Sequence, residues 1–379
     1  MRFLDLFAGI GGFRLGMERA GHECVGYVEW DKYARKSYEA IHNTEGEWTA
    51  HDIFNVSDEE LRTLGERNID VICGGFPCQS FSVAGKRLGF EDTRGTLFFE
   101  IARFAKEIKP RYLFLENVKG LLNHDKGKTF TTILRTLDEL GYDAEWQVLN
   151  SKDFGVPQNR ERVFIIGHLR GTGGREIFPI GRTDAATNLP IEIIAHRNGY
   201  RRNTQVFSPD GITETLDTGT GGGRGHYTAI PVLTPDRVEK RQNGRRFKED
   251  GEPMFTLTSQ DRHGIAIREA TKKGYDIAQE GDAVNFQFPD SKTRRGRVGK
   301  GLANTLETSS NQGTLTSDYR IRKLTPKECF RLQGFPDELF EKAEQVNSNS
   351  QLYKQAGNSV TVNVIEEIAN KLKSQEETK

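Results

Sequence analysis

Cys78 lies in a polar loop, in the segment Gly-Gly-Phe-Pro-Cys-Gln-Ser, directly after a short apolar stretch. A thiolate is a strong nucleophile, so a cysteine in such a loop is a candidate for covalent catalysis. Cys73 lies inside the apolar stretch itself, where a cysteine usually serves as a small buried hydrophobic residue. The sequence therefore favours Cys78 as the reactive thiol.

A carboxylate and two arginines accompany this thiol. Glu116 ends the apolar segment Leu-Phe-Leu-Glu, and the segment Gln-Asn-Arg-Glu-Arg-Val contains Arg160 and Arg162. If the strand of Glu116 neighbours the strand before Cys78, the carboxylate lies beside the thiol. Residues two apart in a strand point to the same face, so the two arginines could converge on one ligand. Taken separately, a solvated strand-end glutamate and paired surface arginines are ordinary features.

The N-terminal segment Asp-Leu-Phe-Ala-Gly-Ile-Gly-Gly-Phe has the glycines of a turn between a strand and a helix. Gly9, Gly11 and Gly12 would let the backbone approach a ligand closely. Glu29 follows about twenty residues later, where a carboxylate grasps the ribose of a nucleotide. This spacing predicts an adenosine-containing cofactor. NAD stays open as an alternative, although the glycines depart from the G-x-G-x-x-G pattern.

Alternating elements must position these groups. Residues 1–170 read as short apolar strands separated by helices, which predicts a mostly parallel sheet covered on both faces. From about 169 to 318 the chain is rich in Gly, Thr, Asn and Arg, with basic clusters at 201–202, 245–248 and 292–300. The last sixty residues regain helical patterning. We expect an α/β domain and a second, smaller, mainly β domain.

Composition narrows the class of protein. The four cysteines form no CxxC pair, so the sequence predicts neither a zinc site nor a disulfide framework. No apolar run approaches the ~20 residues of a membrane span, and the N-terminus is unlike a signal peptide. A cytoplasmic protein without a metal is expected. The formal net charge is zero, so binding of a polyanion would depend on how the charges are distributed.

The motifs form a specific series along the chain. They are DLFAGIGGFRLG, YVEWD, HDIF, GGFPCQSFSVAG, TRGTLFFE, ENV and QNRERVFIIG, and then, after a variable middle, LTPKECFRLQGFPD and QAGNSVTVNV. Together they resemble the cytosine-5 DNA methyltransferases over about residues 1–170 and 320–370. One departure is His51, where the family usually has a glycine.

The resemblance implies a fold and a chemistry. It implies a Rossmann-like, mostly parallel methyltransferase domain that uses S-adenosylmethionine and releases S-adenosylhomocysteine. Cys78 would attack carbon 6 of cytosine, and Glu116 would engage ring nitrogen 3. Arg162 would bind the ring carbonyl oxygen, while Arg160 would position neighbouring elements or a phosphate.

The resemblance also implies a cofactor pocket that gathers residues from across the chain. Its members are Phe7, Gly9, Gly11, Gly12, Glu29, Trp30, Asp52, Ile53, Pro77, Leu97, Asn358 and Val360. Because Asn358 and Val360 come from the C-terminus, the catalytic domain is expected to be discontinuous, comprising 1–175 and 346–379. Residues 176–345 would form the target-recognition domain.

The implied substrate is a flipped-out cytosine in double-stranded DNA. The stretch 79–94 is expected to be a mobile loop that closes over the base, with DNA contacts from Gln79, Ser82, Lys86, Arg87 and Arg94. A monomeric bacterial or phage enzyme is expected, serving restriction–modification, with an independent cognate endonuclease, or phage self-protection. Three alternatives stay open at this point: the same chemistry on tRNA, a catalytically silent DNA-binding protein, and an NAD-linked oxidoreductase.

Overall fold

The computed structural model describes residues 1–77, 97–173, 176–181, 229–233, 263–287, 291, 293–308, 311–316 and 321–374. Cys78 and the expected DNA-contacting residues of the following loop lie outside these ranges; the latter are Gln79, Ser82, Lys86, Arg87 and Arg94. The chain divides into two compact units. Unit 1 comprises Met1–Val156, Arg160–Thr187 and Pro326–Lys379, and unit 2 comprises Pro157–Asn159 and Asn188–Thr325.

Unit 1 is built on one seven-stranded sheet of order β3-β2-β1-β4-β5-β7-β6. The strands are β1 (Arg2–Leu6), β2 (Glu23–Val28), β3 (Trp48–Ala50), β4 (Val71–Gly75), β5 (Tyr112–Val118), β6 (Tyr142–Asn150) and β7 (Glu161–Leu169). Strands β3, β2, β1, β4 and β5 pair in parallel, whereas β7 runs antiparallel to both β5 and β6. The expected mostly parallel α/β sheet is confirmed.

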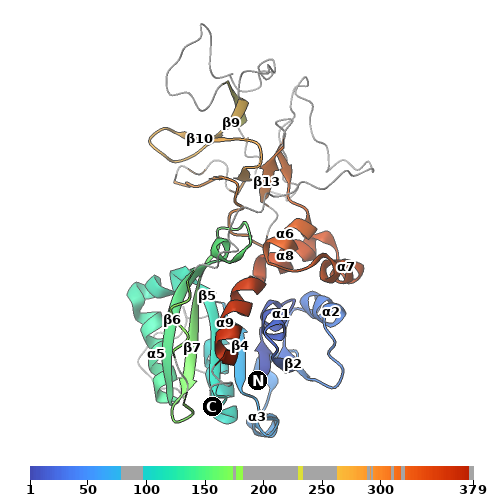
Figure 1. Ribbon diagram of the computed structural model, residues 1–379, viewed down its shortest axis with the longest axis vertical. Helices are drawn as coiled ribbons and strands as arrows, with labels where there is room; N and C mark the ends of the chain where they lie inside the picture. The colour runs from blue at the N-terminus through green and yellow to red at the C-terminus, as the bar shows by residue number, and fades with distance from the viewer. Residues whose placement is uncertain are drawn as a thin grey trace. The chain divides into compact units, whose positions relative to one another are not determined.

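Helices cover both faces of this sheet (Figure 1). The longer ones are α1 (Gly12–Arg19), α2 (Lys32–Ile41), α3 (Asp58–Gly65), α4 (Leu97–Ile108), α5 (Lys128–Glu139), α6 (Pro326–Leu332), α7 (Asp337–Val346), α8 (Asn349–Asn358) and α9 (Val362–Ser374). Short 3-10 turns lie at Ile53–Asn55, Lys119–Gly127 and Ser151–Phe154. None of the helices in the described ranges is long and apolar enough to cross a bilayer.

Side-chain caps explain where two of these helices begin. The carboxylate of Asp31 accepts hydrogen bonds from the amides of Tyr33 and Ala34 at the start of α2. Ser57 caps α3 in the same way, and three acidic residues follow it in the first turn. Such caps satisfy amides that have no partner within the helix, and acidic residues interact favourably with the helix dipole there.

Two apolar cores lie on opposite faces of the sheet. One packs α3, α4 and α5 against the sheet and contains fully buried side chains such as Leu61, Phe98 and Ile133. The other packs α1 and α9 against the sheet, with Met17 and Leu372 among its members. Each fully buried aliphatic or aromatic side chain contributes about 1.5–3 kcal/mol through the area it removes from water.

The contact between α1 and α9 joins the two ends of the chain and depends on Gly16. A Cβ at this position would lie 2.6 Å from Cβ of Ile365 and 2.9 Å from the carbonyl oxygen of Val362. The Gly16→Val substitution is therefore expected to lower the free energy of unfolding by about 3 kcal/mol through overpacking. Denaturant titration of the variant measures this loss.

Gly120→Val is the matched control, because Gly120 is exposed and its nearest neighbour, Cγ2 of Val118, would lie 4.0 Å from the new Cβ. Its expected effect is within about 0.5 kcal/mol. Equal effects of the two substitutions would mean that the close approach of α1 and α9 does not explain Gly16.

Helices α6 and α7 belong to unit 1. The domain boundary expected from sequence lay at 345/346, whereas unit 2 ends at Thr325. The difference arises because α6 packs against α8 and α7 packs against α2. Just after α7, Nδ2 of Asn347 donates to the carbonyl of Tyr33 at 2.8 Å. Helical patterning in a sequence does not reveal which partner a helix will choose.

Unit 2 is mainly β in its described part. One sheet has the order β10-β9-β8 and the other β12-β11-β13-β14, all antiparallel. The strands are β8 (Ala229–Leu233), β9 (His263–Arg268), β10 (Tyr275–Ala278), β11 (Ala283–Asn285), β12 (Val298–Gly299), β13 (Gln312–Leu315) and β14 (Ile321–Lys323). A small apolar core that includes Ile265, Val284 and Leu315 joins the two sheets.

Candidate active site

The predicted site residues gather at the carboxyl edge of the parallel strands. Consecutive strands β1, β2 and β3 extend in one direction from β1, and β4 then pairs on the other side of β1. Open α/β sheets bind ligands where the strand order reverses in this way. Phe7, Glu29 and Phe76 directly follow β1, β2 and β4 at this edge, and Asp52 lies just beyond β3.

The glycine turn after β1 has a strained residue and an open one. Phe7 has a φ of 56°, in the left-handed region that non-glycine residues rarely adopt. Gly9 also has a positive φ, and a Cβ there would meet nothing within 4 Å. The amide of Gly9 donates to Oε2 of Glu29 at 2.7 Å. The turn therefore presents open backbone beside a carboxylate.

Glu29 is held by amides on both sides. Its second oxygen, Oε1, accepts the amide of Asp31 at 2.7 Å. Burial raises the pKa of the Glu29 carboxyl, and the amides of Asp31 and Gly9 oppose that rise. Trp30 follows with 72% of its surface exposed, which is unusual for so large an apolar side chain. Open backbone, a fixed carboxylate and an exposed aromatic ring fit an adenosine-containing ligand.

The other two glycines of the turn make room for protein, not for a ligand. A Cβ at Gly11 would coincide with the ring of His42, lying 2.8 Å from its Cδ2 atom. A Cβ at Gly12 would lie 2.7 Å from Oγ of Ser359. The expectation that all three glycines allow a ligand to approach is therefore corrected: among them, open space is found only at Gly9.

The ring of His42 packs against the glycine turn. Its Nε2 atom lies 3.2 Å from the carbonyl oxygen of Ile10. Burial, together with the nearby charge of Arg14, lowers the pKa of His42 to about 3. The ring is therefore neutral near pH 7, and it must carry its proton on Nε2 to donate to this carbonyl.

Gly11→Ala is expected to weaken binding of S-adenosylmethionine and to destabilise the fold by about 3 kcal/mol, since it adds a clash with His42 to an unfavourable φ. Gly46→Ala is the matched control: Gly46 has a φ of +78°, close to the +82° of Gly11, but open space around it. It should cost only about 1 kcal/mol. Adding His42→Ala to Gly11→Ala should recover part of the loss, as measured by denaturation and calorimetric titration; no recovery would contradict the clash.

The remaining residues of the predicted cofactor pocket differ in exposure. Asp52 caps the 3-10 turn that follows it by accepting the amide of Phe54 at 3.1 Å, and Ile53 is buried. Leu97 begins α4 and is half-buried. Asn358 and Pro77 are exposed, whereas Val360 is buried.

The segment that leads into Cys78 is held by the strand beside it. In the parallel pairing of β4 with β5, Gly75 lies opposite Glu116. A Cβ at Gly75 would lie 3.2 Å from Oε2 of Glu116. Nδ2 of the buried Asn117 donates to the carbonyl of Phe76 at 2.7 Å. The carboxylate therefore lies beside the backbone three residues before Cys78, as the sequence predicted for neighbouring strands.

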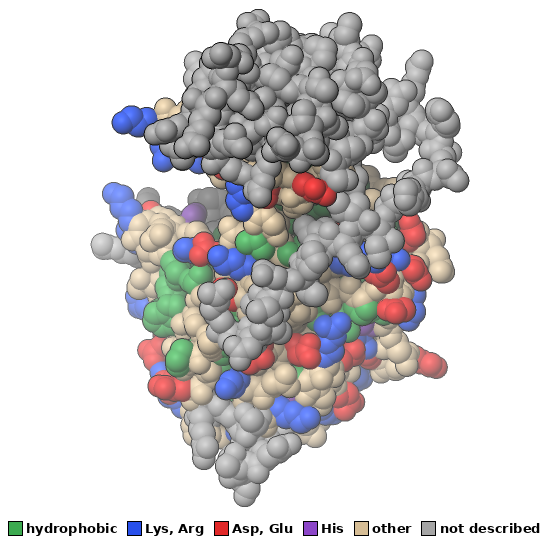
Figure 2. All heavy atoms as spheres, turned by 45° about the horizontal axis from the view of Figure 1, so that its top comes forward, with side chains coloured by type: hydrophobic (Ala, Val, Ile, Leu, Met, Phe, Trp, Pro, Cys, Tyr) green, Lys and Arg blue, Asp and Glu red, His purple; other side chains and the backbone are tan. Residues whose placement is uncertain are grey.

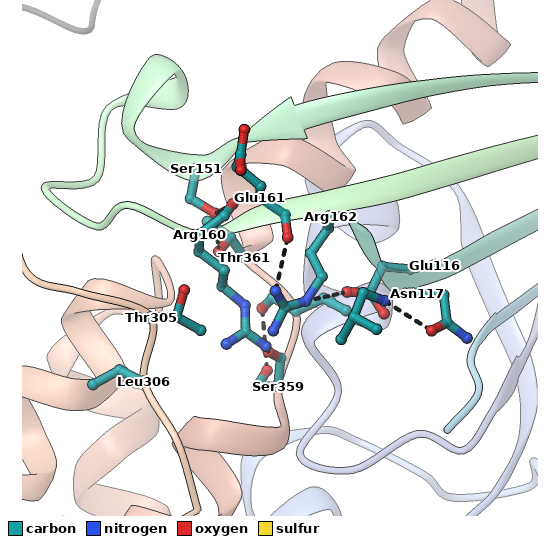
Figure 3. A network of polar contacts seen from close by, with 12 residues as sticks. Glu116, Asn117, Ser151, Arg160, Glu161, Arg162, Thr305, Leu306, Ser359 and Thr361 are labelled. Carbon is teal, nitrogen blue, oxygen red and sulfur yellow. Dashed lines mark hydrogen bonds and ion pairs between the residues drawn. The ribbon is translucent and has the colours of Figure 1, made fainter. Parts of the chain in front are cut away.

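Arg162 completes this cluster. Because β7 is antiparallel to β5, Arg162 at its start lies opposite Val118, on the face that also carries Glu116. Nε of Arg162 lies 3.0 Å from Oε1 of Glu116, and both side chains are largely buried. Figure 3 shows the two side chains pointing at each other.

Arg160 takes a different direction (Figure 3). It precedes β7, so the alternation of a strand does not apply to it. Its Nη2 atom donates to the carbonyl of Ser359 at 2.7 Å and to that of Gly357 at 3.3 Å. The two arginines, which the sequence allowed to converge on one ligand, therefore point to different partners. Burial, and next the charge of Arg162, lower the pKa of Arg160.

In unit 2, the arginines of the basic cluster 292–300 have different surroundings. Arg297 is buried and its guanidinium lies 3.2 Å from the carbonyl oxygen of Gln287. Arg294 forms an ion pair with Glu307 at 3.6 Å, and Arg295 is exposed while its Nε donates to the carbonyl of Ala270. Basic residues that are adjacent in sequence are thus partly structural. In the described residues, no three His, Cys, Asp or Glu side chains are grouped as a metal ion would require.

The family model for C-5 cytosine-specific DNA methylases matches residues 1–374. The chain belongs to this family. It is therefore a DNA cytosine methyltransferase, and the NAD-linked alternative is excluded.

Sequence relatives agree with this family, and a solved structure shares the fold. The type II methyltransferase M.HhaI of Haemophilus parahaemolyticus is 36% identical over 373 residues, which cover 97% of this chain and 93% of that protein. The orphan methyltransferase M.SPRI of Bacillus phage SPR is 35% identical, with 98% and 97% covered. A putative DNA modification methyltransferase encoded within an E. coli prophage shares the fold, with a TM-score of 0.55 and 21% identity over 100% of this chain and 99% of that chain.

Proposed function

We propose that this methyltransferase adds a methyl group to carbon 5 of a cytosine within a specific double-stranded DNA sequence, through a covalent adduct with Cys78. The observation that carries the proposal is the pair formed by Glu116 and Arg162 beside the strand end that leads to Cys78. A carboxyl group and a guanidinium 3.0 Å apart match two adjacent polar atoms on one edge of a cytosine ring.

Carbon 5 of cytosine is a poor nucleophile, so the ring must first be activated. Addition of the Cys78 thiolate to carbon 6 breaks the 5,6 double bond and places electron density on carbon 5. An unperturbed thiol has a pKa of about 8.5, so only a few per cent is ionised near neutral pH. Loss of the thiol proton must therefore precede or accompany the attack.

Glu116 is proposed to stabilise the charge that this addition places on the cytosine ring. Ring nitrogen 3 has a lone pair and no hydrogen, so Glu116 would engage it in its protonated form, by donating the carboxyl proton. This hydrogen bond stabilises the charge that develops on the ring as the thiolate adds. Arg162 donates to the ring carbonyl oxygen next to that nitrogen. Asn117, which holds the carbonyl of Phe76, keeps the start of the cysteine loop against the same strand end.

S-adenosylmethionine would supply an electrophilic methyl group to carbon 5 and leave as S-adenosylhomocysteine. Loss of the carbon 5 proton to a base would then restore the 5,6 double bond and expel the Cys78 thiolate. Three residues have the strongest structural support as contacts of S-adenosylmethionine. The space around Gly9 is open, the carboxylate of Glu29 is held by a backbone amide, and the ring of Trp30 is exposed. Phe7, Asp52, Ile53, Pro77, Leu97, Asn358 and Val360 are proposed as further contacts. Gly11 and Gly12 would act indirectly, by allowing the turn to pack on His42 and Ser359.

A base stacked in a duplex cannot enter such a site, so we propose that the target cytosine flips out of the helix. The cost is a few kcal/mol of lost pairing and stacking. The loop residues Gln79, Ser82, Lys86, Arg87 and Arg94 are proposed to contact the DNA, and unit 2 to recognise its sequence. Figure 2 shows basic and acidic side chains of the described residues interspersed on the visible face, so specific contacts, not overall charge, would select the DNA.

Bisulfite sequencing of DNA from a host that expresses this chain tests the proposal. The expected result is methylation of one cytosine within a short recurring sequence, which is absent from a host expressing Cys78→Ser. Transfer of labelled methyl groups to tRNA but not to DNA would contradict it. Relatives include both type II and phage orphan methyltransferases, so we propose a role in restriction–modification or phage self-protection. Protection of the host DNA from a cognate endonuclease tests the first of these roles.

A further inference from the structure

We propose that Arg160 is a positioning residue that anchors the C-terminal segment 357–361 and thereby couples the cofactor pocket to the base pocket. The inference rests on the proposed function, since Asn358 and Val360 in this segment are proposed cofactor contacts. It gives Arg160 a role different from that of Arg162, its neighbour in the sequence.

The guanidinium of Arg160 joins two segments that are almost two hundred residues apart in the chain. It is 3% exposed, and its Nη2 atom binds the carbonyls of Gly357 and Ser359, which flank Asn358. The amide of Arg160 donates to Oδ1 of Asn150 at 3.0 Å, so its own backbone is held at the end of β6. One guanidinium therefore bonds to the backbone on both sides of Asn358.

A second set of hydrogen bonds, through Ser151 and Thr361, also joins the backbone near Arg160 to the segment 357–361. Oγ of Ser151 lies 2.8 Å from Oγ1 of Thr361 and 3.3 Å from the carbonyl oxygen of Arg160. Thr361 in turn donates to Oε1 of Gln333 at 3.0 Å, and Nε2 of Gln333 donates to the carbonyl of Ala356 at 2.9 Å. All of these side chains are buried, so each hydrogen bond is costly to lose.

Two residues of α8, Lys354 and Gln355, contact residues next to the proposed cofactor pocket. Nζ of Lys354 forms an ion pair with Oδ2 of Asp31 at 2.6 Å, and the amide of Asp31 donates to Glu29. Gln355 accepts a hydrogen bond from Oγ of Ser37 on α2 at 2.9 Å. Helix α8 thus leads from the carboxylate proposed for the ribose to the segment that Arg160 holds.

Arginine suits this position for a geometric reason. Its planar guanidinium presents several N–H donors in a fixed arrangement and stays charged, whereas lysine offers a compact ammonium on a flexible stem. Removing the guanidinium leaves two buried carbonyls without this donor, and the segment must shift to find others. Arg162, by contrast, is directed at Glu116 on the base side.

The test compares Arg160→Met with Arg162→Met by calorimetric titration of S-adenosylhomocysteine in the absence of DNA. We expect Arg160→Met to weaken binding by about tenfold or more, and Arg162→Met to leave it within about twofold. In turnover, Arg160→Met should raise KM for S-adenosylmethionine, whereas Arg162→Met should lower kcat. Arg160→Lys should recover part of the affinity.

Two other results would overturn the inference. One is an Arg160→Met variant that binds S-adenosylhomocysteine as tightly as the wild type but binds DNA more weakly, with a smaller dependence of DNA binding on salt. This result would make Arg160 a phosphate contact. If Arg160→Met does not fold, the milder Thr361→Val variant serves the same titration, and unchanged affinity there likewise contradicts the anchoring role. A wild-type protein that does not bind S-adenosylhomocysteine would instead contradict the proposed function.

Discussion

Replacing Cys78 by serine is expected to abolish DNA methylation, with a fall in kcat of about 10⁴-fold or more, the scale on which loss of an enzymic nucleophile acts. A hydroxyl is far less ionised than a thiol near neutral pH, so it cannot add to carbon 6 at a useful rate. Duplex DNA with 5-fluorocytosine at the target site gives the direct readout. Fluorine cannot leave as the proton does, so the adduct with Cys78 should persist through denaturing electrophoresis.

The other cysteines provide matched controls. Cys24, Cys73 and Cys329 are buried free thiols, and burial raises the pKa of Cys24 and of Cys329 to about 12. Cys329→Ala should therefore keep both methylation and the trapped adduct. A Cys78→Ser variant that still forms the adduct would show that another residue is the nucleophile.

Glu116→Gln is expected to lower kcat by about 10²–10⁴-fold while binding of S-adenosylhomocysteine stays within about twofold. The substitution keeps the size of the side chain but replaces one carboxyl oxygen by an NH2 group. The ion pair with Arg162 is therefore lost, and although the NH2 group can still donate a hydrogen bond to ring nitrogen 3, it has no acidic proton to transfer there. Single-turnover methylation and the 5-fluorocytosine adduct report the effect on the chemical step.

Glu100→Gln serves as the comparison. Glu100 is equally buried, and it pairs with Arg103 at 2.8 Å on α4, so it controls for loss of a buried ion pair elsewhere in unit 1. It should cost stability but leave the rate of the chemical step unchanged. If Glu116→Gln kept the wild-type rate, Glu116 would have only a structural part, as a partner of Arg162.

Much of the fold and of the site was predictable from local patterns. The order of apolar strands and helices in residues 1–170 indicated a mostly parallel sheet. The structure has five parallel strands, and next to them β7, which is antiparallel to both of its neighbours, β5 and β6. The position of Glu116 at a strand end predicted its place beside the strand that leads to Cys78. These inferences succeeded because parallel strands bring their carboxyl ends to one edge.

The atom that Asn117 binds and the role of His42 were harder to find. Asn117 follows Glu116 directly, and only the pairing of β4 with β5 reveals that it binds the carbonyl of Phe76. His42 lies about thirty residues from the glycine turn, and nothing in its neighbourhood in the sequence marks it as the support beneath Gly11. Both roles depend on contacts between separate elements.

By itself, the sequence determined the family, the thiol proposed as the nucleophile and the strand ends that carry its partners, because motif chemistry and hydrophobic periodicity are local properties. Only the tertiary structure decided that Arg162 turns to Glu116 while Arg160 turns to Gly357 and Ser359. It also decided that Gly11 makes room for His42 and that α6 and α7 belong to unit 1. The physical reason is that these outcomes depend on which distant backbone and side chains come into contact, which the spacing of residues along a chain does not specify.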